Sequence, residues 1–150
     1  MIGLQAAGKS TFRRARFDAT HEVVSKDLFP NHRRPSLRQT ELLRGALSAG
    51  RSVVVDNTNV QTADRTTLIV LGREYGARCI GYFLPSSVDA SLQRNAGRIG
   101  KARVPDKGVL ATAKRFQDPT WAEGFDELYE VRWATPSDYE IVAVPRGTTT

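Results

Sequence analysis

The sequence has few of the residues and runs that mark several common classes of protein. Its single cysteine, Cys79, excludes an internal disulfide and fits a reducing compartment. The two histidines, His21 and His32, are isolated from each other, and we expect them to be structural or exposed. No apolar run approaches the roughly 20 residues that a membrane-spanning helix needs, and no signal peptide is visible after Met1. We therefore expect a cytoplasmic protein without a membrane partner.

Acidic side chains are outnumbered by basic ones. The 150 residues contain 22 Lys and Arg against 16 Asp and Glu, a net charge of +6, and 17 of the basic residues are arginine. The planar guanidinium of arginine suits bidentate contacts with phosphate. This balance permits a nucleic-acid partner without requiring one. The length predicts one domain, residues 1–150, and no obligate protein partner is evident in the sequence.

The most informative stretch is Gly3–Ser10, which reads Gly-Leu-Gln-Ala-Ala-Gly-Lys-Ser. It fits G-x-x-x-x-G-K-[ST], the Walker A pattern or P-loop, in which glycines bring backbone N–H groups against phosphate oxygens. Lys9 is expected to reach the β- and γ-phosphates of ATP, and the Ser10 hydroxyl is expected to bind Mg²⁺. The loop residues predicted to contact the nucleotide are Gly3, Gln5, Ala6, Ala7, Gly8, Lys9, Ser10 and Thr11.

Very little chain precedes this loop. A P-loop ordinarily follows a buried strand of about four to six apolar residues, whereas only Met1 and Ile2 precede Gly3. Because that strand is usually central in the sheet, we expect its loss to leave a gap in the core. The start is expected to be truncated or misassigned, or else to be tolerated as a stub.

Strand-like and helix-like segments alternate along the rest of the chain. β-Branched and aromatic runs predict strands at 21–25, 52–55, 78–84, 128–133 and 139–144. Apolar residues at helical spacing predict helices that begin at or near Lys9, Ser36, Thr62, Val88 and Asp106. Ser36 and Gln39 form a capping-box pattern at the second of these. The alternation predicts an α/β fold of the P-loop NTPase type: a three-layer sandwich with a mostly parallel sheet, helices on both faces and a truncated first strand.

Two aspartates follow predicted strands, at the sheet edge where ligands bind in such folds. Asp56 ends the valine run 53–55. This is the Walker B arrangement, in which a carboxylate organises the metal, although Asp-Asn after a strand is also a common turn. Asp27 follows strand 21–25 and is either a base for the hydroxyl of a phosphate acceptor or a surface or capping residue. A metal site is thus predicted at Ser10 and Asp56.

An Arg- and Gly-rich segment covers residues 93–103. Arg94 and Arg98 are spaced to lie on one face of a helix. We expect this segment to close over ATP, so that positive charge neutralises the γ-phosphoryl group in the transition state. A solvated basic loop is the alternative.

Several motifs occur together in one order along the chain. They are Gly3–Thr11, Ser25-Lys26-Asp27, Val54–Asn59, Arg94-Asn95-x-x-Arg98 and Phe116-x-x-Pro119-Thr120-x-Ala122-Glu123-Gly124-Phe125. Together they resemble the kinase domain of polynucleotide 5′-hydroxyl kinases, especially the kinase half of the animal polynucleotide kinase 3′-phosphatases. The resemblance extends from Gly3 to about Trp133, and its last stretch is the most specific part.

The resemblance implies a kinase that transfers the γ-phosphate of ATP, with Mg²⁺, to a 5′-OH end of DNA or RNA in nucleic-acid end repair. It implies that Lys9, Asp27 and Arg98 are catalytic, with Asp27 as the general base, and that Asp56 lies near the metal. The chain departs from phage enzymes at Pro30, where an arginine would help hold the substrate phosphate. An Asp-x-Asp-x-Thr phosphatase motif is missing from the sequence, so we expect a kinase without 3′-phosphatase activity.

Three functions remain open from the sequence. The first is the ATP-dependent 5′-OH polynucleotide kinase, and the second is a P-loop kinase for a small metabolite or nucleoside-like acceptor. A basic groove leading to Asp27 would favour the first, whereas a closed pocket would favour the second. The third is a nucleotide-binding module without turnover, which measurable phosphate transfer would exclude. The sequence leaves open the choice between DNA and RNA and the oligomeric state.

Overall fold

Short runs of β-branched and aromatic residues form the strands of the computed structural model, which describes residues 1–147. β1 (Glu22–Val24) pairs in parallel with β2 (Val53–Val55). β3 (Ile80–Phe83) pairs in parallel with β4 (Glu127–Thr135), and β5 (Asp138–Ala143) returns antiparallel to β4. The chain therefore has the predicted α/β character with parallel strand pairs. Its strands form two sheets, one of two strands (β1 and β2) and one of three (β3, β4 and β5).

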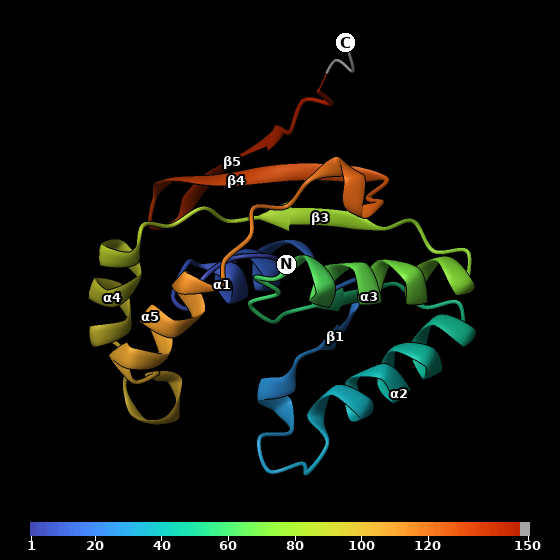
Figure 1. Cartoon of the computed structure of the whole chain (residues 1–150), viewed down its shortest axis with the longest axis horizontal. Coiled ribbons are helices and arrows are strands. Elements are labelled where there is room, and N and C mark those ends of the chain that lie inside the picture. Colours follow the sequence, from blue (N-terminus) through green and yellow to red (C-terminus); the bar gives the residue numbers. More distant parts are fainter. Residues whose placement is uncertain (148–150) are drawn as a thin grey trace.

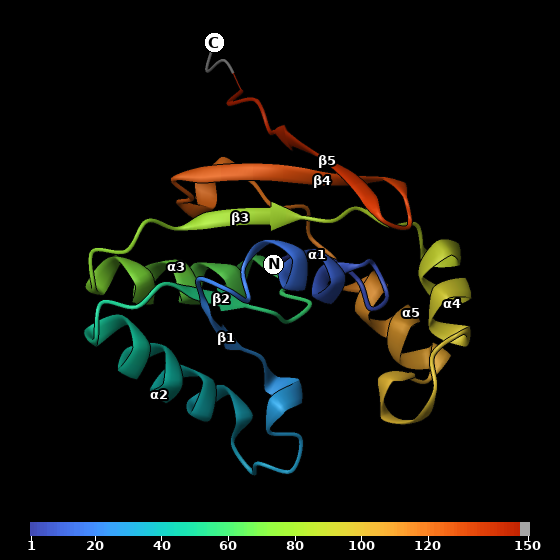
Figure 2. The same cartoon turned by 180° about the vertical axis from the view of Figure 1, so that it is seen from behind.

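The first residues of the chain lie between these two sheets (Figure 2). The Ile2 N–H donates to the Tyr82 carbonyl at 2.8 Å, and the Ile2 carbonyl accepts from the Leu84 N–H at 2.8 Å, which makes a parallel bridge to β3. On the other side, the Met1 ammonium donates to the Val55 carbonyl of β2 at 3.1 Å. Met1 and Ile2 thus lie in the position of a central strand and bond to both sheets.

Helices pack on both faces of the strands. They are α1 (Lys9–Arg16), α2 (Pro35–Ser48), α3 (Thr62–Glu74), α4 (Val88–Ala96) and α5 (Asp106–Lys114). Figure 1 shows α3 in front of the strands, and the view from behind in Figure 2 shows α1 on the opposite face. Phe12 of α1 belongs to a core cluster with Val54 and Val131, whereas Ile69 of α3 packs with a separate cluster. Within residues 1–147, no helix has the length and apolar character needed to cross a membrane.

The start of α2 differs from its prediction. The helix begins at Pro35 with Arg34 as its N-cap, and no side chain caps it, so the capping box of Ser36 and Gln39 is wrong. Proline favours the first helical position because its φ is already set and its missing N–H would have no intrahelical partner there. Ser36 therefore lies inside the first turn, and the Gln39 side chain is free to bond elsewhere.

A buried ion pair ties α3 to the segment before β4. The guanidinium of Arg65 donates to both oxygens of Glu123, at 2.6 and 2.7 Å, and both side chains are only 2% exposed. Glu123 lies in the 3₁₀ turn η3 (Trp121–Glu123), where its carboxylate also accepts from the Thr120 N–H. Arg65 further donates to the Asn59 carbonyl, which follows β2. Through this ion pair, the Pro-Thr-x-x-Glu-Gly-Phe stretch holds α3 and the residues after β2 against the segment before β4.

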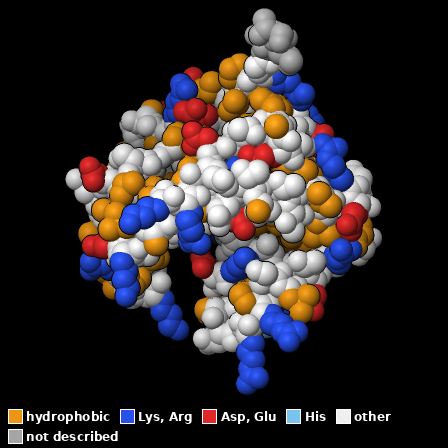
Figure 3. Space-filling view, in the orientation of Figure 1, with side chains coloured by type: hydrophobic (Ala, Val, Ile, Leu, Met, Phe, Trp, Pro, Cys, Tyr) orange, Lys and Arg blue, Asp and Glu red, His pale blue; other side chains and the backbone are white. Residues whose placement is uncertain are grey.

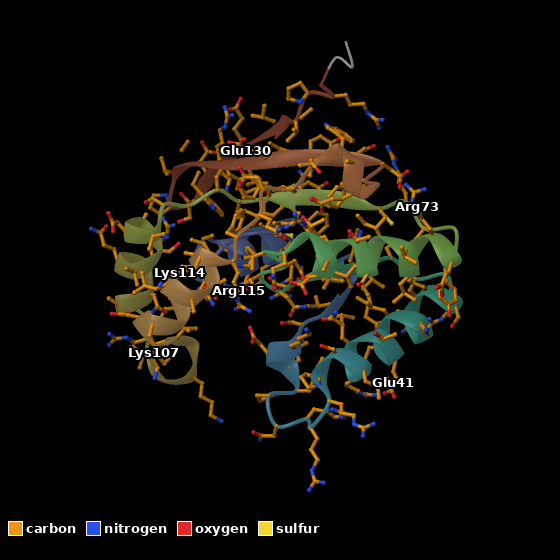
Figure 4. All side chains as sticks on the ribbon, viewed as in Figure 1. Glu41, Arg73, Lys107, Lys114, Arg115 and Glu130 are labelled. Atoms are coloured by element: carbon orange, nitrogen blue, oxygen red, sulfur yellow. The ribbon has the colours of Figure 1, made fainter. Side chains whose placement is uncertain are left out.

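Replacing Glu123 by glutamine is expected to lower the free energy of unfolding by about 3–5 kcal/mol, because the Arg65 charge would remain buried without its counter-ion. Urea unfolding followed by circular dichroism measures this change. Glu41→Gln provides the matched control, since Glu41 lies exposed on α2 (Figure 4) and its ion-pair partner, Arg38, is exposed as well. Equal unfolding midpoints for the two variants would contradict a stabilising role for the Arg65–Glu123 ion pair.

Candidate active site

The glycine-rich loop turns sharply at Gly8, immediately before α1. Gly8 has a φ of 95° in the left-handed region, which glycine adopts without strain. A Cβ at Gly8 would also lie 2.5 Å from Nε1 of Trp133, so the indole ring packs directly against the loop. Both observations require glycine at this position. Trp133, on β4, therefore supports the loop from the sheet side.

Lys9 begins α1 and folds back over the loop. Its ammonium donates to the carbonyls of Gly3 and Leu4, at 2.8 and 2.5 Å, and the residue is only 8% exposed. Burial lowers the pKa of Lys9 to about 8, and the charge of Arg98 acts in the same direction. The carboxylates of Asp56 and Asp27 oppose this shift in the pKa of Lys9. The lysine is therefore held at the loop by carbonyl groups, with charged groups of both signs around it.

Ser10 and Asp56 lie in direct contact. The Ser10 hydroxyl donates to Oδ2 of Asp56 at 2.8 Å, and Asp56 is buried at the end of β2. Arg13, one turn along α1, places Nε 2.9 Å from the same oxygen and also contacts Asp18. This pairing was missed from the sequence, although the spacing from Ser10 to Arg13 puts both on one helix face.

The residues present fit a magnesium ion bound together with nucleotide phosphates. Magnesium usually takes one or two carboxylates and fills its remaining positions with phosphate oxygens and water. Asp56 and Ser10 supply one carboxylate and one hydroxyl at adjacent positions. No group of three His, Cys, Asp or Glu side chains gathers anywhere in residues 1–147, so nothing there competes as an all-protein metal cage.

Asp27 lies in the 3₁₀ turn η1 (Lys26–Leu28), directly after β1. The Ser25 hydroxyl accepts from the Asp27 N–H at 3.3 Å and caps this turn. The Asn57 side chain accepts from the Lys26 N–H at 2.9 Å and donates to Oε1 of Gln39 at 2.6 Å. Asn57 thus ties the turn that carries Asp27 to the end of β2 and to α2. The Asp27 side chain itself is exposed.

A cleft of ≈ 1040 Å³ collects most of the predicted site residues. Figure 3 shows the molecule hollowed at its lower edge, with Lys and Arg side chains on both sides of the hollow. The predicted residues that line the cleft are Gln5, Ala6, Gly8, Lys9, Ser10, Thr11, Asp27, Asp56 and Arg98. The base candidate and the phosphate-binding loop therefore face one space. Gly3, Ala7 and Arg94 do not line it.

Arg94 and Arg98 lie on different segments and have different neighbours. α4 ends at Ala96, before Arg98, so the expectation that the two arginines share one helix face is wrong. Arg94 donates to the Ala6 carbonyl at 2.6 Å and supports the loop from the side. Arg98 lies in the connection to α5 and lines the cleft.

The segment between α4 and α5 carries Arg98, and one side chain holds its two ends together. Asn95, which is 0% exposed, bonds both the N–H and the carbonyl of Val104, at 3.0 and 2.6 Å. Between these two residues the chain forms a short loop that includes the 3₁₀ turn η2 (Gly100–Ala102). Arg98 donates to the Ala102 carbonyl at 3.2 Å within this loop. The loop is thus pinned at its ends while its tip projects beside the cleft.

Two comparisons with known proteins bear on this site. A family model described as "AAA domain" matches residues 1–119, which include the P-loop, Asp27, Asp56 and Arg98. The bifunctional polynucleotide phosphatase/kinase of Schizosaccharomyces pombe is 30% identical over 146 residues, covering 93% of this chain and 34% of that protein. The chain thus spans about a third of the length of that relative. The relative confirms the resemblance that the motifs predicted.

Proposed function

The chain belongs to the AAA domain family of P-loop proteins, and from this premise we propose that it is a kinase that transfers the γ-phosphate of ATP to the 5′-hydroxyl end of a DNA or RNA strand. One observation carries the proposal: Asp27 and the phosphate-binding loop face the same cleft of ≈ 1040 Å³. A carboxylate opposite a P-loop suits transfer to a hydroxyl, since the hydroxyl must lose a proton as it attacks phosphorus.

Each site residue has a role in this proposal. The loop amides and Lys9 bind the phosphates, and the positive end of α1 adds to the attraction. Asp56 and Ser10 would hold Mg²⁺, which when bound neutralises phosphate charge. Asp27 accepts the proton of the acceptor hydroxyl, and Arg98 stabilises charge on the transferred group. Phosphoryl transfer relies on such positioning and electrostatic stabilisation more than on covalent chemistry by the protein.

The lining of the cleft supports a nucleic-acid acceptor. Two of its five basic side chains, Lys9 and Arg98, serve ATP in this proposal, and three more, Arg14, Lys26 and Lys101, are left for the acceptor, against the acidic Asp27, Asp56 and Asp64. The basic groups come from α1, from η1 and from the connection between α4 and α5, so positive charge is spread along the cleft, as a backbone with one charge per phosphate would require. A small neutral metabolite would not need positive charge so spread out. The name of the Schizosaccharomyces pombe relative agrees with this acceptor class.

Transfer of labelled γ-phosphate to a panel of acceptors tests the proposal. The panel contains a 5′-OH oligonucleotide, the same oligonucleotide with a 5′-phosphate, and a free nucleoside. We expect label on the 5′-OH oligonucleotide alone, with DNA and RNA versions compared side by side. Preferential labelling of the nucleoside would support a small-molecule kinase. Binding of Mg-ATP without transfer to any acceptor would support a module without turnover.

The lowered pKa of Lys9 predicts a pH dependence for ATP binding. Below its pKa of about 8 the free protein holds Lys9 in the charged form that attracts phosphate, and above it the lysine is increasingly neutral. ATP affinity should therefore fall as the pH rises through 8, with proton uptake accompanying binding in that range. Titration calorimetry between pH 7 and about 9.5, in two buffers of different ionisation enthalpy, measures both effects. Lys9→Met should bind ATP more weakly and lack this proton uptake; an unchanged uptake would assign it to another group.

A further inference from the structure

A tight turn in the glycine-rich loop contains an alanine with a left-handed backbone. The turn runs from Leu4 to Ala7, and the Ala7 N–H donates to the Leu4 carbonyl at 3.3 Å. Ala6, the third of these four residues, has a φ of 58°. A positive φ at this position is typical of a type II turn, which favours glycine there. The conformation costs free energy for a residue that carries a Cβ, so it persists only where the surrounding structure holds it.

Arg94 of α4 holds this alanine from outside the loop. Its Nε donates to the Ala6 carbonyl at 2.6 Å, and its Nη2 donates to the Ser86 hydroxyl at 2.6 Å. The Ser86 hydroxyl lies 2.8 Å from the hydroxyl of Ser91, which is 0% exposed. A planar guanidinium that bonds two partners keeps a fixed orientation. The Ala6 carbonyl is therefore fastened to α4 and to the segment that precedes this helix.

Two basic side chains hold carbonyl groups of the loop. The Lys9 ammonium donates to the carbonyls of Gly3 and Leu4. Arg94 does the same for Ala6 from a different element of the fold. A carbonyl oxygen turned toward an anion would repel it, whereas a loop of this kind binds phosphate through its N–H groups. By fixing the Ala6 carbonyl, Arg94 therefore helps to keep the loop in a form that presents N–H groups to phosphate.

We propose that Arg94 is a positioning residue, which holds Ala6 in its left-handed conformation and so sets the affinity for ATP without contacting ATP. Ala6 lines the cleft and Arg94 does not, so the arginine acts on the cleft through the Ala6 carbonyl. The alternative is a direct contact between Arg94 and the nucleotide. The proposal rests on the ATP binding that the proposed kinase requires and is independent of its acceptor.

Arg94→Met, Ala6→Gly and the double variant test the proposal in the full chain, with calorimetry of Mg-ATP binding in the absence of any acceptor. Arg94→Met is expected to weaken binding by about tenfold, because the cost of a left-handed alanine then falls on the loop alone. Ala6→Gly should bind within about threefold of the unmodified chain, since glycine adopts this φ without support. For the same reason, the double variant should bind within about threefold of Ala6→Gly.

The double variant separates the proposal from a direct contact with ATP. A tenfold loss that persists when Ala6 is glycine would place Arg94 on the nucleotide and overturn the proposal. An unchanged affinity in Arg94→Met would also overturn it. Arg115→Met is the matched control, because Arg115 follows α5 and does not line the cleft. It should bind ATP like the unmodified chain; a loss equal to that of Arg94→Met would indicate a general charge effect and contradict the proposal.

Hydrogen exchange in the free protein measures the same coupling, so its result stands even if the chain phosphorylates no acceptor. The Ala7 amide reports on the turn, because it bonds to the Leu4 carbonyl. Arg94→Met should speed exchange at Ala7 by about tenfold, and the double variant should exchange there like Ala6→Gly. The Asp126 amide, which bonds to the Cys79 carbonyl outside the loop, should exchange at the same rate in all four chains. Unchanged exchange at Ala7 in Arg94→Met, or equal acceleration at Asp126, would overturn the proposal.

Discussion

Replacing Asp27 by asparagine is expected to slow phosphate transfer by about 10²- to 10⁴-fold while leaving ATP binding nearly unchanged. Asparagine keeps the size and the backbone contacts of the η1 turn but cannot accept the proton of the acceptor hydroxyl. Asp27 lines the cleft, and it is not among the residues of the P-loop itself. Single-turnover transfer with saturating Mg-ATP and a 5′-OH oligonucleotide measures the rate, and calorimetry measures the ATP affinity.

The matched control for this change is Asp138→Asn. Asp138 is exposed at the start of β5 and does not line the cleft, so its loss removes the same charge without touching the site. We expect this variant to transfer phosphate at the rate of the unmodified chain. If Asp27→Asn also retains that rate, Asp27 is not the base, and its exposure in the η1 turn reflects an ordinary surface position.

Replacing Arg98 by glutamine is expected to lower the rate of transfer by about 10³-fold or more, with a smaller effect on ATP affinity. The guanidinium would stabilise charge that develops on the γ-phosphoryl group only as the transition state forms. The influence of Arg98 on the pKa of Lys9 supports this role, because it indicates that the two charges lie close enough to interact. Steady-state kinetics that separate kcat from KM for ATP measure the two effects.

Arg115→Gln serves as the control for Arg98. Arg115 follows α5 (Figure 4), and its guanidinium donates to the Ala111 carbonyl of that helix, so its removal lowers the net charge by the same amount away from the cleft lining. Its transfer rate should match that of the unmodified chain. An Arg98→Gln variant that weakens ATP binding without lowering kcat would make Arg98 a binding residue, and equal losses in both variants would indicate a general charge effect.

Local sequence patterns predicted the parts of the site that depend on local structure. The Walker A spacing fixes the loop and the start of α1, because Gly8 supplies the left-handed turn and Lys9 begins the helix. The valine run before Asp56 predicts a strand end, and the structure places Ser10 against this carboxylate. Asp27 likewise follows a strand whose C-terminal end meets the same edge of the sheet.

Contacts between residues far apart in the chain could not be predicted in the same way. Asn57 bonds both Lys26 and Gln39, and neither pairing leaves a pattern in a single sequence. The packing of Trp133 against Gly8 joins positions at opposite ends of the chain. The predicted capping box at Ser36 was wrong for a local reason, because Pro35 takes the first position of α2. An apolar pocket of ≈ 210 Å³ beside Met1, lined by residues of β2 and β3, likewise depends on packing between distant segments.

The most direct measurement is mass spectrometry of a 5′-OH oligonucleotide after incubation with the protein, ATP and Mg²⁺, followed by sequencing of the product to locate the added phosphate. The account predicts a single added phosphate at the 5′ end, formed only when Mg²⁺ is present. An unmodified oligonucleotide, from protein that binds Mg-ATP by calorimetry, would contradict the proposed acceptor. A phosphate at any other position would contradict the proposed reaction at the cleft.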